Sequence, residues 1–168
     1  ILEEEWEHHR FAVRDLDLVR DDAWPHALAV LAGGPATRPA VVEPAYATVD
    51  NGSRHTVEPY TAWWIRTHAR IDGLRLHEFC AADAEPVVRS LLRPLDVGLD
   101  NGMTRALRLP TTLAEAEPSL LLDRLADPDL RLSARDLASV YAVLATADPQ
   151  AVSVPQRVRI PDGAGSRV

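Results

Sequence analysis

Apolar and charged residues alternate along the first twenty positions in a way that is typical of a helix surface. The apolar residues recur at roughly helical spacing, although the pattern is imperfect; they are Leu2, Trp6, Val13, Leu16 and either Leu18 or Val19. This spacing predicts an amphipathic helix over residues 2–20. Glu4 with His8, and Glu5 with His9, lie one turn apart on it. Because zinc needs three or four convergent ligands, a solvated helix surface is the favoured interpretation of these pairs.

A second helix is expected to follow Asp22, which can cap it. Pro25 suits the first turn of this helix, and the sequence Gly33-Gly34-Pro35 ends it. The apolar residues of the segment are Trp24, Leu28 and Leu31. The proline-rich stretch that continues to Pro44 is predicted to be a connector.

A hairpin followed by a helix is the clearest local unit of the pattern. The stretch 46–57 contains two short β-prone runs around Asp50-Asn-Gly-Ser53, and an Asn-Gly pair readily supplies the positive φ angles of a tight turn. A helix over 59–70 is expected next, with Asp72-Gly73 as its stop. The Asp-Asn-Gly sequence recurs at 100–102, but its flanks differ, so separate turns are favoured over an internal repeat.

Helices with recognisable caps are predicted further along the chain. A short one covers 85–92, with Asp83 as its cap and Pro94 as its terminator. Helices at 113–126 and 134–146 each follow a hydroxyl residue placed three positions before a carboxylate. We expect these two helices to pack as an antiparallel pair through Leu121, Leu122, Leu125, Leu137, Val140, Tyr141 and Leu144.

The end of the chain is predicted to form a strand at 156–161 that enters a hairpin at Asp162-Gly163. The sequence Asp162-Gly-Ala-Gly165 superficially resembles a nucleotide-binding loop. No helix follows it and no lysine could reach a phosphate, so a hairpin turn is favoured. The chain starts at Ile1 and stops just after this strand, from which we expect it to be a piece of a larger protein.

Composition favours an α+β fold that is predominantly helical with a small β-hairpin component. Of the 168 residues, 46% are hydrophobic but only 5% are aromatic, a balance suited to helix packing. One domain is expected, with two subdomains as the alternative. Residues 1–22 would be an N-terminal helix or a linker from an upstream domain. Residues 23–168 would be a mainly helical accessory domain, truncated at its C-terminal end.

Charge and cysteine content exclude several classes of function. All 18 basic residues are arginine, which codon bias in a GC-rich genome explains, and no lysine is available for catalysis. A net charge of −7 opposes attraction to phosphate backbones or anionic lipid. The single cysteine, Cys80, allows no intrachain disulfide, which fits a cytoplasmic setting. The longest apolar run, 27–32, is too short to span a membrane, so no membrane partner is expected.

The residues Tyr60, Trp63, Trp64, Arg66 and Arg70 form the candidate interaction surface of the sequence. Aromatic and basic side chains together can stack on and hold a nucleic acid strand. Helical spacing instead separates the two tryptophans, which favours one in the core and the other over the hairpin. An exposed tryptophan of the pair would indicate a protein interface, because Trp and Arg often anchor such interfaces.

His77 and Cys80 are the one pair that suggests nucleophilic catalysis. A thiol needs a neighbouring base to become a nucleophile. The sequence identifies neither a third member nor an oxyanion hole, and a free cysteine is usually buried and inert.

Three stretches of the chain resemble large bacterial proteins described as sacsin-like. They are Ala23-Trp-Pro-His-Ala-Leu28, Arg38-Pro-Ala-Val-Val-Glu-Pro-Ala-Tyr46 and Thr56-Val-Glu-Pro-Tyr-Thr-Ala-Trp-Trp64. The resemblance extends from about residue 23 to the end and rests on no catalytic signature. In that family an ATPase domain of the chaperone and histidine-kinase superfamily precedes a long further region, and this chain resembles part of the later region.

The resemblance implies that ATP belongs to the parent protein. The family's ATP site needs an Asn-bearing helix, an Asp-x-Gly-x-Gly loop and a glycine-rich lid, and the sequence contains none of them. No nucleotide-binding residue is therefore carried over, and no cofactor or metal is expected. The expected function is a non-catalytic accessory or protein-interaction domain of a larger sacsin-like ATPase. The alternatives are a nucleic-acid-binding module that uses hairpin 46–57 and helix 59–70, and a small Cys/His hydrolase.

Overall fold

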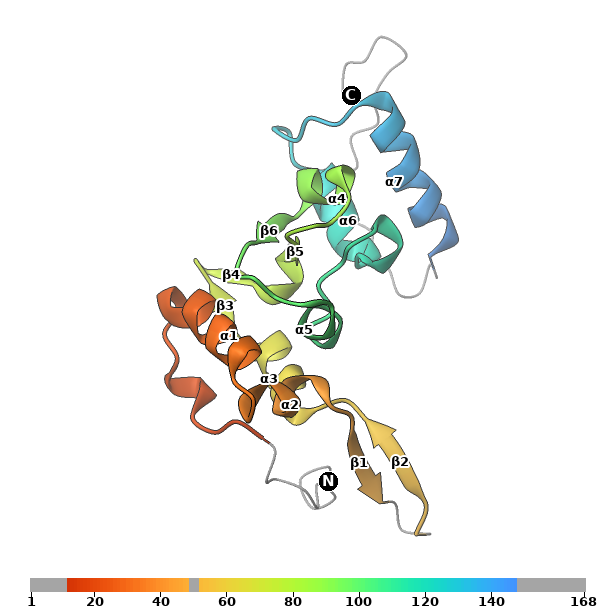
Figure 1. Cartoon of the computed structure of the whole chain (residues 1–168). Coiled ribbons are helices and arrows are strands. Elements are labelled where there is room, and N and C mark those ends of the chain that lie inside the picture. Colours follow the sequence, from red (N-terminus) through yellow and green to blue (C-terminus); the bar gives the residue numbers. More distant parts are fainter. Residues whose placement is uncertain (1–11, 49–51, 148–168) are drawn as a thin grey trace. The chain divides into compact units, whose positions relative to one another are not determined.

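The computed structural model describes residues 12–48 and 52–147 (Figure 1). Their backbone divides into two compact units, each assembled from separate stretches of chain. Unit 1 comprises the described residues up to His77 together with Asp96–Leu109, and unit 2 comprises Glu78–Leu95 with the described residues from Pro110 onward. Helices predominate and strands are short, so the predicted α+β class, mainly helical with a small hairpin component, is confirmed.

Unit 1 combines short helices with two antiparallel hairpins in its described part. Helix α2 contacts α1, α3 and α5, and the core between these helices is closed by buried side chains that include Trp24, Leu28, Val41, Ile65 and Met103. The elements of the unit are 3₁₀ turns at Leu16–Leu18 and Asp21–Ala23, α1 (Trp24–Gly33), α2 (Thr37–Val42), β1 (Ala45–Thr48), β2 (Arg54–Val57), α3 (Tyr60–His68), β3 (Arg70–Ile71), β4 (Leu74–Arg75) and α5 (Asn101–Ala106).

The predicted hairpin at 46–57 is confirmed, and a second hairpin follows it. Strands β1 and β2 pair antiparallel with Tyr46 opposite Thr56. Strands β3 and β4 pair across Asp72 and Gly73, whose φ angles of 51° and 80° both lie in the left-handed region. Two successive positive φ angles match the twist of paired strands. Asp72-Gly73 therefore makes a tight turn between strands, whereas the sequence suggested only a helix stop.

The helix predicted over 2–20 is not present in its described part. Residues 16–18 form only a 3₁₀ turn, and Asp15 before it has a φ of 60°, which an α-helix does not allow. Aspartate tolerates this conformation because its short side chain can bond locally. Leu18 is 74% exposed, so the apolar spacing does not mark a buried face here. Residues 1–11 lie outside the described part.

The second helix and the connector after it both need correction. Helix α1 begins at Trp24 as expected with Pro25 in its first turn, but Asp22 does not cap it and instead pairs with Arg20. The expected connector contains helix α2. Pro39 lies in the first turn of α2, where a missing N–H costs nothing, so the proline content did not exclude a helix.

Unit 2 contains a parallel strand pair and three helices in its described part. Helix α4 connects β5 to β6, and Cys80 of β5 lies opposite Pro94 of β6. Parallel strands require such a crossover. The elements are β5 (Phe79–Ala81), α4 (Pro86–Leu91), β6 (Arg93–Leu95), a 3₁₀ turn at Leu113–Glu115, α6 (Pro118–Leu125) and α7 (Ala134–Thr146). A further 3₁₀ turn, Leu76–Glu78, spans the point where the chain passes from unit 1 to unit 2.

Two of the predicted helices of unit 2 differ from the structure at their ends. Glu85, not Asp83, is the N-cap residue of α4, and Pro94 lies in a strand. The capping box of Thr112 and Glu115 is confirmed, yet it opens a 3₁₀ turn. A residue before proline avoids helical backbone angles, and Glu117 before Pro118 is extended. The 3₁₀ turn therefore does not continue as a helix, and α6 begins at Pro118.

The pairing of the last two described helices is as expected in its contacts. Helix α7 has the predicted bounds, and the Ser133 hydroxyl accepts a hydrogen bond from the Asp136 N–H at 3.1 Å. Helices α6 and α7 contact each other, and Leu121, Leu125 and Val140 are buried among the predicted packing residues. The predicted strand at 156–161 with the turn after it, and the pairs of Glu4 with His8 and Glu5 with His9, lie outside the described residues.

Candidate functional site

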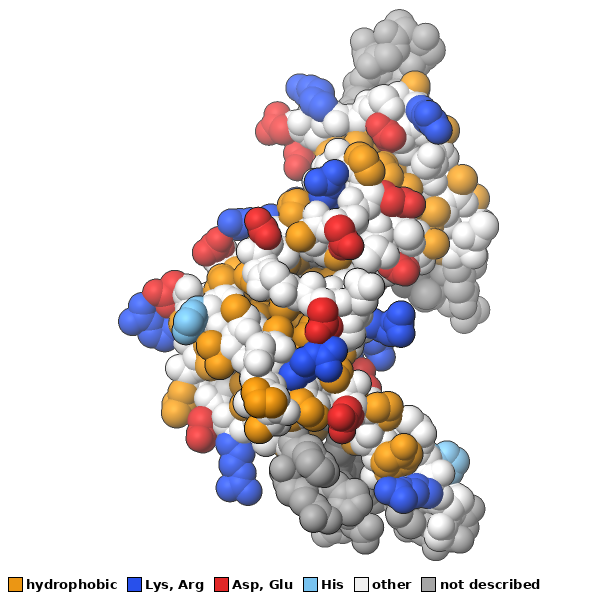
Figure 2. Space-filling view, in the orientation of Figure 1, with side chains coloured by type: hydrophobic (Ala, Val, Ile, Leu, Met, Phe, Trp, Pro, Cys, Tyr) orange, Lys and Arg blue, Asp and Glu red, His pale blue; other side chains and the backbone are white. Residues whose placement is uncertain are grey.

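Helix α3 has one buried face and one partly exposed aromatic face. Thr61, Ala62 and Ile65 are fully buried, while Tyr60 and Trp63 are each 39% exposed. The buried Thr61 hydroxyl is satisfied because it accepts a hydrogen bond from the Val13 N–H at 3.0 Å. A helix so anchored holds its exposed rings in fixed positions on unit 1, where Figure 2 shows hydrophobic side chains at the surface.

The aromatic side chains of α3 form one continuous series of ring contacts. The Tyr60 and Trp63 centroids are 5.5 Å apart, and Trp63 meets the His68 imidazole edge-on at 5.6 Å. His68 stacks on Trp64 at 4.8 Å, and Trp64 stacks on Trp24 at 6.1 Å. Trp24 is only 2% exposed. The series therefore leads from two exposed rings to the core of the unit.

The two tryptophans of α3 differ in burial, but neither lies in the core as the helical spacing predicted. Trp64 is half-buried against Trp24, and Trp63 is the exposed member of the pair. Sequence reasoning did not identify Trp24 as the ring beneath Trp64. No local signal could have done so, since Trp24 is separated from α3 by helix α2 and hairpin β1–β2.

Arg66, which the sequence placed on the interaction surface, is engaged inside the unit. Its Nη2 donates to both oxygens of Glu58, at 2.7 and 2.6 Å, and its side chain is only 19% exposed. Arg108 donates to the same carboxylate at 3.0 Å. Arg70 lies beyond the helix in β3, where its Nη1 is 3.4 Å from the Gly73 carbonyl oxygen. The surface around Trp63 is therefore aromatic more than basic.

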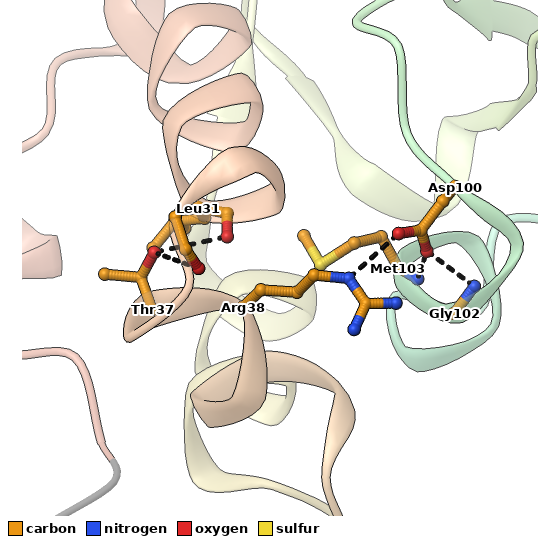
Figure 3. A network of polar contacts seen from close by, with 7 residues as sticks. Leu31, Thr37, Arg38, Asp100, Gly102 and Met103 are labelled. Atoms are coloured by element: carbon orange, nitrogen blue, oxygen red, sulfur yellow. Dashed lines mark hydrogen bonds and ion pairs between the residues drawn. The ribbon is translucent and has the colours of Figure 1, made fainter.

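A second polar cluster in unit 1 joins α2 to the start of α5 (Figure 3). Asp100 Oδ2 accepts a hydrogen bond from Arg38 Nε at 2.9 Å, while Oδ1 accepts from the N–H groups of Gly102 and Met103. The hydrogen bond from Arg38, followed by that from Met103, lowers the pKa of Asp100 to about 2. The cluster satisfies a helix N-terminus, so its role is to fix α5.

Glycine leaves room for this cluster at position 102, because a side chain there would force Arg38 or Asp100 to shift. A Cβ there would lie 2.8 Å from Arg38 Nη2 and 3.0 Å from Asp100 Oδ1. The Asp-Asn-Gly sequence at 100–102 therefore forms the N-terminus of a helix, with Asp100 as its cap. Thr37 closes the neighbouring turn by donating its hydroxyl hydrogen to the Leu31 carbonyl oxygen at 3.2 Å.

Cys80 lacks the surroundings of a reactive thiol. It is fully buried in β5, and its Sγ lies 3.7 Å from the Leu92 carbonyl oxygen, which accepts its hydrogen bond. Burial raises the pKa of the thiol, against a smaller opposite effect of Arg89. A protonated thiol without solvent access is a poor nucleophile. His77 is exposed in the turn Leu76–Glu78.

The described residues contain no group of three or more His, Cys, Asp or Glu side chains that could hold a metal ion. None of the helices within 12–48 and 52–147 has the length and apolar character needed to cross a membrane.

Comparison of the chain with protein-family models, with curated proteins and with solved structures gave no match at a significant level.

Proposed function

We propose that this chain is a non-catalytic protein-interaction domain that presents the exposed rings of α3 to a protein partner. The observation that carries the proposal is the contact between Tyr60 and Trp63 on a helix whose opposite face is fully buried. Tyrosine and tryptophan bury a large area at a small cost in conformational entropy, which is why they anchor protein interfaces.

The engagement of Arg66 favours a protein partner over a nucleic acid. Single strands are held by stacking rings together with cations that meet the phosphates. Glu58 accepts both hydrogen bonds of Arg66 Nη2 and also pairs with Arg108. Arg66 is thus not available to meet a phosphate in a nucleic-acid module of hairpin 46–57 and helix 59–70.

Photocrosslinking at Trp63 tests this proposal. A photoreactive phenylalanine analogue placed at position 63 should capture a protein on irradiation in cells of the source organism. The same residue at Ser139, which is exposed on α7, is the matched control. A Tyr60→Ser background should weaken capture, since Tyr60 lies beside Trp63. Equal capture from both positions, or none from position 63, would contradict the proposal.

The nucleic-acid alternative predicts a different result. A fluorescent single-stranded oligonucleotide would bind the chain at low salt, and its affinity would fall steeply as salt is added. We expect no change in anisotropy at low salt. Salt-sensitive binding that Trp63→Ser abolishes would indicate that the partner is a nucleic acid and not a protein.

We further propose that the parent protein is sacsin-like. This chain would then be an accessory region of a cytoplasmic ATPase. This proposal is supported by the three stretches of sequence resemblance. The coding frame upstream of Ile1 tests it: an Asn-bearing helix, an Asp-x-Gly-x-Gly loop and a glycine-rich lid should be encoded in that order. A start codon directly before Ile1 would discard the parent ATPase and leave the interaction domain.

The Cys/His hydrolase alternative is tested by alkylation. We expect iodoacetamide to modify Cys80 slowly in the native chain and rapidly in denaturant, because burial keeps the thiol protonated and inaccessible. Rapid modification of Cys80 in the native chain would favour the hydrolase alternative.

A further inference from the structure

Among the described residues, hairpin β1–β2 has no third strand beside it. It forms a sheet of two strands, and Figure 1 shows it extending away from helices α1, α2 and α3 of the same unit. Arg54, His55 and Thr56 are exposed, and Tyr46 is 44% exposed. An isolated hairpin is only marginally stable in water, and a third strand or a packed helix is usually required.

The two edges of this hairpin differ in charge. Strand β1 reads Ala-Tyr-Ala-Thr and contains no charged residue, whereas β2 opens with Arg54 and His55. Charged side chains on an edge strand discourage pairing with further strands. Arg54 is also turned toward β1, because its guanidinium lies 4.2 Å from the centre of the Tyr46 ring. The edge of β1 is therefore the one suited to accept another strand.

We propose that β1 pairs antiparallel with β1 of a second copy of this chain. The resulting sheet would have the order β2–β1–β1–β2 and four strands, which exceeds the three needed for independent stability. Two copies of β1, which has no charged residue of its own, can pair around a two-fold axis. Pairing through β2 would instead bring Arg54 and His55 of both copies together. The affinity comes from main-chain hydrogen bonds, as in other strand additions.

The test compares two lysine substitutions in the full chain. Tyr46 and Thr56 are direct partners across the hairpin, so Tyr46→Lys and Thr56→Lys add the same charge at the same level of the sheet. Only the first places it on the proposed interface. Light scattering coupled to size exclusion gives the mass at concentrations from about 10 µM to about 1 mM, the range suited to a weak, small interface. Circular dichroism confirms that each variant is folded.

We expect the mass of the wild-type chain to rise from one copy toward two over this range. Tyr46→Lys should weaken dimerisation at least about tenfold, and Thr56→Lys should change it less than about threefold. A wild-type chain that stays monomeric throughout would overturn the inference, and so would equal effects of the two lysines. The inference does not rest on the α3 surface. Loss of the dimer in Trp63→Ser but not in Tyr46→Lys would move the contact to α3 and overturn pairing through β1.

Discussion

The two units are stabilised by different kinds of side chain. Unit 1 holds most of the described rings, namely Trp24, Tyr46, Tyr60, Trp63 and Trp64, whereas unit 2 has Phe79 and Tyr141. The described residues of unit 1 carry nine arginines and nine carboxylates, and those of unit 2 carry five arginines and nine carboxylates. The negative charge of the described residues is therefore concentrated in unit 2.

Under the proposed function, unit 1 binds the partner and unit 2 supports the fold. In unit 1, polar contacts join residues far apart in sequence: Arg108 and Glu58 are separated by 50 positions, and Arg38 and Asp100 by 62. In unit 2, aliphatic side chains fill the core, and local caps such as Ser133 fix the helix ends. An aromatic, charge-balanced unit is suited to bind a partner, and an aliphatic, acidic unit is suited to remain folded and soluble.

The largest expected effect concerns the core of unit 2. Leu121→Ala removes a fully buried side chain and should lower the free energy of unfolding by about 2–5 kcal/mol. The described tryptophans all lie in unit 1, so their fluorescence reports on that unit. If the units fold separately, denaturation followed by circular dichroism will show an early transition while the fluorescence midpoint stays in place.

The neighbouring position supplies the control for this experiment. Leu122→Ala shortens a half-buried leucine on the same helix and should cost clearly less. A common shift of both probes in Leu121→Ala would show that the two units unfold as one. It would contradict independent folding of the two units.

The next effect concerns the ion pairs of unit 1. Glu58→Gln leaves the largely buried Arg66 with a neutral partner and should cost about 1–3 kcal/mol. Tryptophan fluorescence during urea unfolding measures the loss. Glu43→Gln, a change at an exposed carboxylate, should stay within about 0.5 kcal/mol. Equal stability of the two variants would mean that the Glu58 contacts contribute nothing measurable.

Features with local causes were predictable from the sequence. The two β-prone runs predicted hairpin β1–β2, Pro59 and the following apolar residues predicted α3, and the Ser133 cap predicted α7 at its observed bounds. In each case the residues that decide the structure lie within one turn of it. Of the candidate site, the sequence named Tyr60, Trp63 and Trp64, but it did not determine which tryptophan is exposed.

Features with distant causes were not predictable in the same way. The parallel pairing of β5 with β6 depends on a crossover, and the burial of Trp64 depends on Trp24. The role of Arg66 depends on Glu58, which also pairs with Arg108, 50 positions further along the chain. Charge and ring type can be read from a sequence, but the partner that neutralises or covers a side chain depends on tertiary packing.

A smaller effect is expected from the cap of α5. The pKa of Asp100, about 2, lies below the value near 3.9 of an unfolded aspartate. A depressed pKa means that the carboxylate stabilises the fold above about pH 4 and that this contribution is lost as pH falls toward 2. Asp100→Asn should lower the melting temperature by about 2–4 °C at pH 6 and by less at pH 2. An equal shift at both pH values would show that the charge of Asp100 does not stabilise the cap.

The smallest effect on stability is expected at the proposed binding surface itself. Trp63→Ser and Tyr60→Ser remove rings that are 39% exposed and should change the free energy of unfolding by no more than about 0.5–1 kcal/mol. The matched comparison is Trp64→Ser, which removes a half-buried ring from Trp24 and should cost more. Urea unfolding followed by circular dichroism measures all three, since tryptophan fluorescence itself changes with these substitutions. If Trp63 proves as costly as Trp64, its ring belongs to the core of unit 1, and unit 1 then loses the exposed anchor that distinguishes it from unit 2.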